Sequence, residues 1–211
     1  MPKNNNLTEL YLIRHAETVT NTNPHIIAGR TSGAPLTDRG LGQAVRLGAN
    51  LRQQGLLPDA AYASPARRTR DTGYYSLSAM GIDIEPEIAD EIQEQSHGLS
   101  EGLPRIGVYT PDVLRQIDRQ GKNFRLEGGE SMNEVGERME DWVYDTFEDK
   151  QPGRYFIYTH AGSIKYLASH IEDWSRIKTF ETEVGNATLN LFLLKDGDLS
   201  LEYLNRDAAT I

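Results

Sequence analysis

Two histidines and two arginines stand close behind short apolar segments of the chain. The segments are Leu10–Ile13, Ala60–Ala63 and Tyr155–Tyr158, and the polar residues that follow them are Arg14, His15, Arg68 and His160. Guanidinium groups bind phosphoryl oxygens through paired N–H donors, and a neutral imidazole can act as a nucleophile. If the three segments end at one edge of a sheet, these residues together suit a phosphoryl group, whose charge spreads over several oxygens.

The three apolar segments have the length and composition of buried central strands, and segments with helix signals separate them. Thr37 can cap a helix that reaches about Gln54, and Ser131 with Glu134 forms a capping box before another helix. Strands that alternate with helices predict an α/β fold, a three-layer α/β/α sandwich with a mainly parallel central sheet. In such sheets, ligands bind beyond the carboxyl ends of the strands.

The remaining elements follow from local signals. Ser64 and Pro65 are expected to begin a helix as its N-cap and first residue, and Ile82–Ile84 is expected to be a short strand. Two more helices and a C-terminal hairpin are predicted over Tyr109–Gln120, Ala161–His170, Thr188–Leu194 and Leu199–Leu204. Because no repeat, low-complexity tract or Pro/Ser-rich linker divides the chain, we expect residues 1–211 to form a single domain.

The composition excludes several classes of protein. Lys and Arg number 22 against 31 Asp and Glu, a net charge of −9, whereas a nucleic-acid-binding protein needs a basic surface. With no cysteine, the chain has no disulfide, Cys-ligated zinc, iron–sulfur cluster or thiolate nucleophile. Met1–Asn6 has no apolar run typical of a secretory signal, and no segment approaches the about 18 apolar residues of a membrane helix. We therefore expect a cytoplasmic protein without nucleic-acid or membrane partners.

The ordered motifs around the candidate residues resemble those of the histidine phosphatase superfamily, which has the phosphoglycerate mutase-like fold. Leu12–Thr18 with Asn21 is similar to the motif that opens that family, and Ser64–Arg68 is similar to the segment that carries its second arginine. The other matches, in chain order, are Gly29–Arg30, Pro35–Gly40, Glu94–Gly102, Gly128–Ser131, Thr159–Gly162 and Asn186–Thr188. Matches in the same order over most of the chain are far more specific than any one motif.

The resemblance implies two in-line phosphoryl transfers through a phosphohistidine. His15 would be the nucleophile, Arg14 and Arg68 would bind the non-bridging oxygens, and His160 would hold the transferring group from the other side. Glu94 would protonate the leaving alcohol and then, ionised, activate water. The chemistry requires no metal or other cofactor, because the arginines neutralise the phosphoryl group.

Several of these residues also have a purely structural interpretation. Asn21 and Arg30 are further candidates for phosphate binding, but each could instead make hydrogen bonds within a loop. Glu94 could belong to a solvated acidic rim, since seven carboxylates and no Lys or Arg lie between Gly81 and Gly102. A histidine after a strand can also be a hydrogen-bonded structural residue.

The leading hypothesis is a phosphatase that acts on a small phosphorylated metabolite. The nearest alternative is a cofactor-dependent phosphoglycerate mutase with the same residues. Mutases of that family usually carry a long insertion after the acid motif, whereas about 25 residues, Leu103–Glu127, fill that interval here. A third alternative is a catalytically inactive phospho-ligand-binding domain on the same fold, which would not need an acid at Glu94. The sequence leaves the substrate's identity and a homodimer open.

Overall fold

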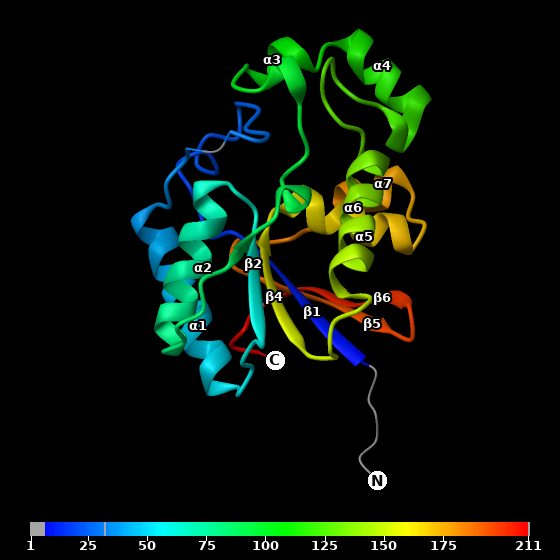
Figure 1. The fold of residues 1–211 in the computed structure, drawn as a ribbon. Coiled ribbons are helices and arrows are strands. Elements are labelled where there is room, and N and C mark those ends of the chain that lie inside the picture. The colour runs from blue at the N-terminus through cyan, green and yellow to red at the C-terminus, as the bar shows by residue number, and fades with distance from the viewer. Residues whose placement is uncertain (1–6, 32, 211) are drawn as a thin grey trace.

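The computed structural model describes residues 7–31 and 33–210 and confirms the predicted three-layer α/β/α arrangement (Figure 1). Its six-stranded sheet has the order β3-β2-β4-β1-β5-β6. The strands are β1 (Leu7–Arg14), β2 (Ala60–Ala63), β3 (Glu87–Ile88), β4 (Arg154–Thr159), β5 (Leu189–Lys195) and β6 (Asp198–Arg206). Strands β3, β2, β4 and β1 are parallel, and the β5–β6 hairpin is added antiparallel beside β1.

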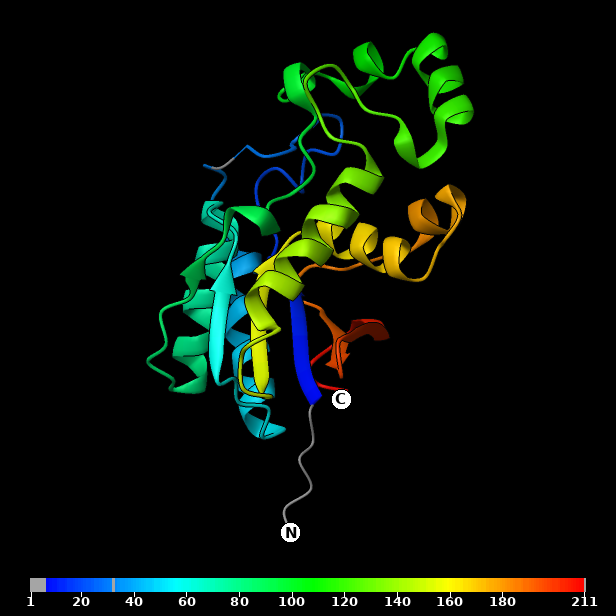
Figure 2. The same cartoon turned by 45° about the vertical axis from the view of Figure 1, so that its right-hand side comes forward.

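The alternating side chains of β1 show how the sheet is covered on both faces. Tyr11 and Ile13 pack into the hydrophobic core under one pair of helices, whereas Leu10 and Leu12 pack into the core under another pair. The first pair is α1 (Asp38–Gln53) and α2 (Arg67–Met80), and the second is α5 (Met132–Phe147) and α6 (Ala161–Ile171). Figure 2 shows the two helical layers on either side of the sheet.

Two predicted helix starts are confirmed by their capping hydrogen bonds. The Thr37 hydroxyl accepts from the Gly40 N–H at the start of α1, at 2.9 Å. Ser131 and Glu134 form the predicted reciprocal capping box at the start of α5. Each cap satisfies backbone donors that have no partner within the helix.

The predicted helix start at Ser64 and Pro65 is wrong. Helix α2 begins at Arg67, and its N-cap Ala66 makes no side-chain capping hydrogen bond. The Ser64 hydroxyl is instead hydrogen-bonded to Nε2 of His160, at 2.8 Å. The Ser64 side chain, which the local pattern predicted to cap a helix, therefore makes a tertiary hydrogen bond instead.

The predicted strand at Ile82–Ile84 is also wrong, because the edge strand β3 is formed by Glu87–Ile88. Helix α2 ends at Gly81, which has a left-handed conformation with φ 69°. The Ile82 N–H then bonds back to the Leu77 carbonyl at 3.1 Å, which closes a Schellman-type helix end. The Ile82 N–H is therefore hydrogen-bonded within the helix end and cannot pair with a neighbouring strand.

A helical segment lies beyond the carboxyl ends of the parallel strands, at the top of Figures 1 and 2. It contains α3 (Arg105–Val108) and α4 (Pro111–Gln120), neither of which has a fully buried residue. The helix predicted over Tyr109–Gln120 thus begins at Pro111, after the cap Thr110. Helix α7 (Arg176–Glu181) was not predicted. Short 3₁₀ helices cover Asp90–Ile92, Gly98–Ser100 and Gly121–Asn123.

The predicted helix over Ala161–His170 and the C-terminal hairpin are confirmed, with their ends shifted by a few residues. The segment Met1–Asn6, for which we predicted no secretory signal, lies outside the described residues. Within residues 7–31 and 33–210, no helix has both the length and the apolar character needed to cross a membrane.

Candidate active site

The ends of β1 and β4 bring the two histidines together. The backbone N–H of His15 donates to the Thr159 carbonyl at 3.0 Å, so the two strand ends are joined directly before each histidine. The ring centroids of His15 and His160 lie 5.4 Å apart, and the side chains are 5% and 1% exposed. Parallel pairing of β1 with β4 therefore places two buried imidazoles at the edge of the sheet where ligands bind in such folds.

The hydrogen bond made by His15 fixes its tautomer. Nδ1 lies 2.8 Å from the Ala16 carbonyl oxygen, which can only accept, so Nδ1 carries the proton and Nε2 carries the lone pair. Burial, followed by the charges of Arg68 and Arg14, lowers the pKa of His15 well below its usual value. The ring is therefore neutral at neutral pH, as a nitrogen nucleophile must be.

Buried polar atoms without a hydrogen-bond partner occur at two of the residues that follow the strands. Among the residues that the structure describes, the buried side-chain nitrogen and oxygen atoms without a hydrogen-bond partner are Arg14 Nε, His160 Nδ1 and the Tyr203 hydroxyl. Leaving a buried polar group unpaired costs about 1–3 kcal/mol, which favours a ligand that pairs with it. Two of these three atoms belong to residues that follow strands, Arg14 and His160.

Arg14 and Arg68 are fixed by backbone carbonyls. Arg14 donates to the Val184 carbonyl at 2.7 Å, and Arg68, which is 3% exposed, donates to the carbonyls of Thr31 and Gly29. In the described part of the chain, neither guanidinium forms an ion pair with a carboxylate. Burial lowers the pKa of both arginines, and the nearby Glu94 opposes this shift. His15, His160, Arg14 and Arg68 are called the strand-end cluster below.

Glu94 lies in a loop, Gln93–Ser96, that we call the acid loop. Its Oε2 accepts from the Gly162 N–H at 3.2 Å, and its Oε1 accepts from the Gln95 N–H at 2.9 Å. A Cβ atom at position 162 would lie 2.1 Å from Oε1, so the carboxylate occupies space that only glycine leaves free. Glu94 is thereby held at the first turn of α6, the helix that follows His160.

Arg30 binds the acid loop in this structure. Its Nε donates to the Glu94 carbonyl at 2.9 Å, and its terminal nitrogen forms a 2.7 Å ion pair with Glu130. The Asn21 amide oxygen accepts from the Thr18 N–H at 3.0 Å and from the side-chain amide of Asn186 at 3.3 Å. Asn186 also donates to the His15 carbonyl at 2.9 Å, so Asn21 is linked to the strand-end cluster, as Arg30 is linked to the acid loop.

Glu130 and Arg138 complete the support of the acid loop, and sequence reasoning missed both as site residues. The Glu130 carboxylate accepts from the Ser96 N–H at 2.9 Å and from Arg138 Nε at 3.0 Å. Arg138 also donates to the Gln93 carbonyl at 3.3 Å. The sequence signal was present, since Glu130 lies within the Gly128–Ser131 motif, but that motif was interpreted only as a helix start.

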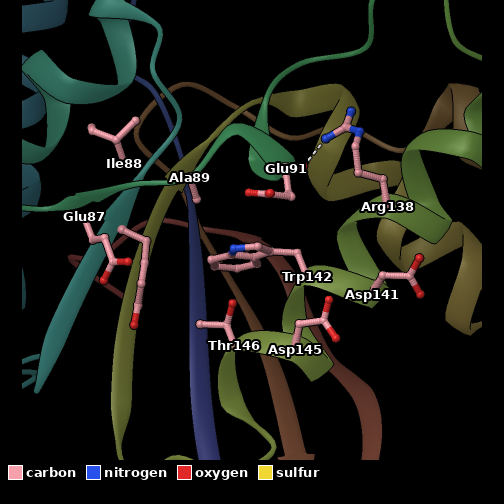
Figure 3. A pocket seen from close by; sticks show the side chains of 10 residues that line it. Glu87, Ile88, Ala89, Glu91, Arg138, Asp141, Trp142, Asp145 and Thr146 are labelled. Atoms are coloured by element: carbon pink, nitrogen blue, oxygen red, sulfur yellow. Dashed lines mark hydrogen bonds between the residues drawn. The ribbon is translucent and has the colours of Figure 1, made fainter.

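A separate cavity of about 470 Å³ lies between β3 and α5. Figure 3 shows its lining, which includes four carboxylates and the indole of Trp142; the carboxylates are those of Glu87, Glu91, Asp141 and Asp145. None of the strand-end cluster or Glu94 lines this cavity. Its negative charge makes it unsuitable for a phosphate ester, whereas the strand-end cluster is cationic.

The residues of the strand-end cluster suit an anion rather than a metal ion. Within residues 7–31 and 33–210, no group of three or more His, Asp or Glu side chains is arranged to hold a metal. The available groups are N–H donors and fixed positive charges, which are the partners of phosphoryl oxygens.

The chain belongs to the histidine phosphatase superfamily (branch 1), whose family model matches residues 10–207. The probable phosphoglycerate mutase GpmB of Escherichia fergusonii is 28% identical over 167 residues, which cover 78% of this chain and 75% of that protein. The superfamily includes both phosphatases and mutases, so membership defines a class of phosphoryl-transfer chemistry and leaves the individual reaction to be proposed.

Two solved structures share the fold. Phosphoserine phosphatase from Entamoeba histolytica, in complex with phosphoserine, superposes with a TM-score of 0.82 at 20% identity, covering 97% of this chain and all (100%) of that chain. Phosphoglycerate mutase from Bacillus anthracis superposes with a TM-score of 0.77 at 22% identity, covering 98% and 96%. These similarities confirm the phosphoglycerate mutase-like fold.

Proposed function

We propose that this protein is a phosphatase that hydrolyses a small phosphomonoester through a phosphohistidine on His15. Nε2 of His15 attacks phosphorus in line, a P–N bond forms, and the P–O bond to the alcohol breaks. Glu94 gives its proton to the departing oxygen. Glu94, now ionised, takes a proton from water as that water attacks phosphorus, and the P–N bond breaks to release inorganic phosphate and neutral His15.

The main support for this proposal is that a neutral histidine lies beside polar atoms that have no partner within the described part of the protein. His15 is buried and neutral and has its lone pair on Nε2, and Arg14 Nε and His160 Nδ1 lie nearby as buried groups without partners. If the Ser64 hydroxyl donates to Nε2 of His160, then Nδ1–H of His160 donates to a phosphoryl oxygen. Fixed donors of this kind stabilise charge that develops during the transfer.

The catalytically inactive alternative is disfavoured by the placement of Glu94. A domain that only binds phosphate needs cations and donors, and a carboxylate beside them would weaken its affinity for the anion. Here Gly162 and the surrounding loop hold a carboxylate against the cationic site. We therefore propose the acid role for Glu94 and catalysis for the site as a whole.

The mutase is the second candidate, supported by the name of the 28% identical relative from Escherichia fergusonii. A mutase must shelter its phosphoenzyme from water. The segment Leu103–Glu127 is short, and its helices α3 and α4 have no fully buried residue, which supports hydrolysis instead. Phosphate release that proceeds without bisphosphoglycerate supports the phosphatase; release that requires it, together with isomerisation of phosphoglycerate, supports the mutase.

The proposal also covers the partners, the cellular location and the domain organisation of the protein. Its partner is a small phosphorylated metabolite, with no metal or other cofactor and no nucleic acid or membrane. The chain acts in the cytoplasm as one domain, and a homodimer remains compatible with the site.

The decisive experiment is to trap the phosphoenzyme. After rapid quenching with a labelled phosphomonoester, we expect a covalent adduct that is acid-labile and base-stable, as a phosphoramidate is. His15→Ala should lose the adduct and all turnover, whereas His170→Ala, a change of another histidine at the far end of α6, should keep both. An adduct of equal size in His15→Ala would overturn the proposed nucleophile.

A further inference from the structure

Lys165 is a lysine that the proposed phosphoryl transfer does not use. It lies on α6 and is partly buried. Within residues 7–31 and 33–210, its ammonium has no hydrogen-bond or ion-pair partner. Burial lowers the pKa of Lys165, Arg14 acts in the same direction, and Glu94 opposes the shift. A partly buried cation without a counter-ion is unusual, because buried charges are normally paired.

The register of α6 places Lys165 beside the acid. Gly162, whose N–H binds Glu94, is three residues earlier, and residues three apart share a helix face. The opposing effects of the Glu94 and Arg14 charges on the pKa of Lys165 agree with this position.

The next turn of α6 shows which segment packs against the Lys165 face of the helix. Ser169 lies one turn after Lys165 and is hydrogen-bonded to Thr179 of α7 at 2.7 Å. The chain that leaves α7 returns to Val184, whose carbonyl accepts from Arg14. Lys165 is therefore on the side of α6 that faces this returning segment, at the margin of the strand-end cluster.

The proposed mechanism determines which part of a substrate meets this ammonium. Glu94 protonates the ester oxygen, so the alcohol part of the substrate lies on the Glu94 side of phosphorus. Lys165 lies about one helical turn from the Gly162 amide that holds Glu94, whereas the proposed ligands of the phosphoryl oxygens are Arg14, Arg68 and His160. A positive charge near the departing alcohol recognises a negative charge on that alcohol.

We propose that Lys165 binds a second anionic group on the alcohol part of the substrate, either a carboxylate or a second phosphate. This inference rests on the proposed function, and it narrows the substrate to phosphomonoesters of acidic alcohols. Neutral alcohols would leave the ammonium unpaired and bind less tightly.

Matched substrates test the inference. 3-Phosphoglycerate and glycerol 3-phosphate differ in a carboxylate, and the mono- and bisphosphates of 1,3-propanediol differ in a phosphate. In each pair, the compound with the additional anion is called the acidic member and the other the neutral member. If Lys165 binds that anion, Lys165→Met should raise KM for the acidic member about tenfold. The kcat values and the KM for the neutral member should change little. Lys165→Arg should restore most of the preference, and the two pairs distinguish the carboxylate from the phosphate.

A matched charge-loss control is Lys195→Met, because Lys195 lies at the far end of β5, paired with Leu7. It should leave both KM values unchanged. Equal changes for acidic and neutral members in Lys165→Met, or a change confined to kcat, would overturn the inference and place the lysine's effect on Glu94 or the phosphoryl group. A wild-type protein without preference for either acidic member would overturn it as well.

Binding measurements separate this inference from the proposed function. Calorimetry on His15→Ala, with and without Lys165→Met, measures the affinity for each matched compound without turnover. If no phosphomonoester is hydrolysed but the acidic member still loses about tenfold affinity through Lys165→Met, the catalytic proposal fails and the subsite stands. If hydrolysis proceeds and the affinities of each pair change equally, the subsite fails alone.

Discussion

The strand-end cluster and the acid loop act on the same phosphoryl group in the proposed mechanism, but different forces hold them in place. His15 and His160 follow paired strands, so the backbone hydrogen bonds of the sheet fix their separation. The acid loop lies outside the sheet and is held by hydrogen bonds to the side chains of Arg30, Glu130 and Arg138 and to the Gly162 amide. The proposed binding of the phosphoryl group thus depends on the core of the fold, whereas the proposed proton transfer depends on a few hydrogen bonds between distant segments.

Replacement of an arginine in the strand-end cluster should have the largest effect. Arg68→Lys keeps the charge but loses the planar pair of donors, so we expect kcat/KM to fall about 10²–10³-fold. The loss should be similar for alkyl phosphates and for p-nitrophenyl phosphate, because both present the same phosphoryl oxygens. Inhibition by vanadate should weaken in parallel, and Arg67→Lys, a change at an exposed neighbour, serves as the control.

Glu94→Gln should be selective where Arg68→Lys is not. We expect turnover of alkyl phosphates to fall about 10²–10³-fold, since their oxygen needs a proton, while p-nitrophenyl phosphate loses less than about tenfold in the first transfer. The measurement is single-turnover kinetics on both substrates. Equal losses on the two substrates would remove Glu94 from the acid role.

Glu130→Gln should slow turnover of alkyl phosphates more than that of p-nitrophenyl phosphate, as Glu94→Gln does, with a smaller loss of rate. Loss of the Glu130 charge loosens the acid loop while Arg30 still binds the Glu94 carbonyl, so we expect about a tenfold loss confined to alkyl phosphates. The double variant Glu94→Gln/Glu130→Gln should be little worse than Glu94→Gln, because both changes act through one carboxylate. Glu140→Gln, a change on α5 of a carboxylate that pairs with His170 instead of the acid loop, should alter turnover of neither substrate. A loss equal on both substrates would assign Glu130 a general structural role.

The smallest effect concerns stability against pH. Burial and the nearby arginines lower the pKa of His15, so below the unfolded value of about 6.5 the unfolded chain binds a proton that the folded chain does not. Stability should therefore fall as pH drops below about 6.5. The free energy of unfolding, measured by urea denaturation, should fall between pH 7.0 and 5.5 by about 1 kcal/mol more in the wild type than in His15→Gln. An equal pH dependence in the two proteins would show that His15 titrates normally.

The parts of the molecule that the sequence predicted best are those specified by local patterns. Apolar runs predicted β1, β2 and β4, and the cap residues Thr37 and Ser131 predicted where two helices begin. Because parallel strands end at one edge, the sequence predicted that His15 and His160 lie at the same edge of the sheet; the pairing of β1 with β4, which makes them neighbours, came from the structure.

Most of the remaining features depend on contacts between distant segments. Arg30 pairs with Glu130, 100 residues away, and no local pattern indicates that pairing. Ser64 has the sequence context of a helix cap, but it is bonded to His160, 96 residues later. Ile82 belongs to a β-favouring triplet, but the preceding glycine turns its backbone into the end of α2. For Arg30 and Ser64 a tertiary contact decided the outcome, whereas for Ile82 the helix end at Gly81 did.

The first turn of α6 joins the two regions. Its N-cap is His160, and two residues later the Gly162 amide grips the carboxylate of Glu94. One helix therefore carries both the proposed ligand of the phosphoryl oxygens and the anchor of the proposed proton donor. A rigid tilt or slide of α6 would displace both by similar amounts, so their alignment depends on the start of this one helix.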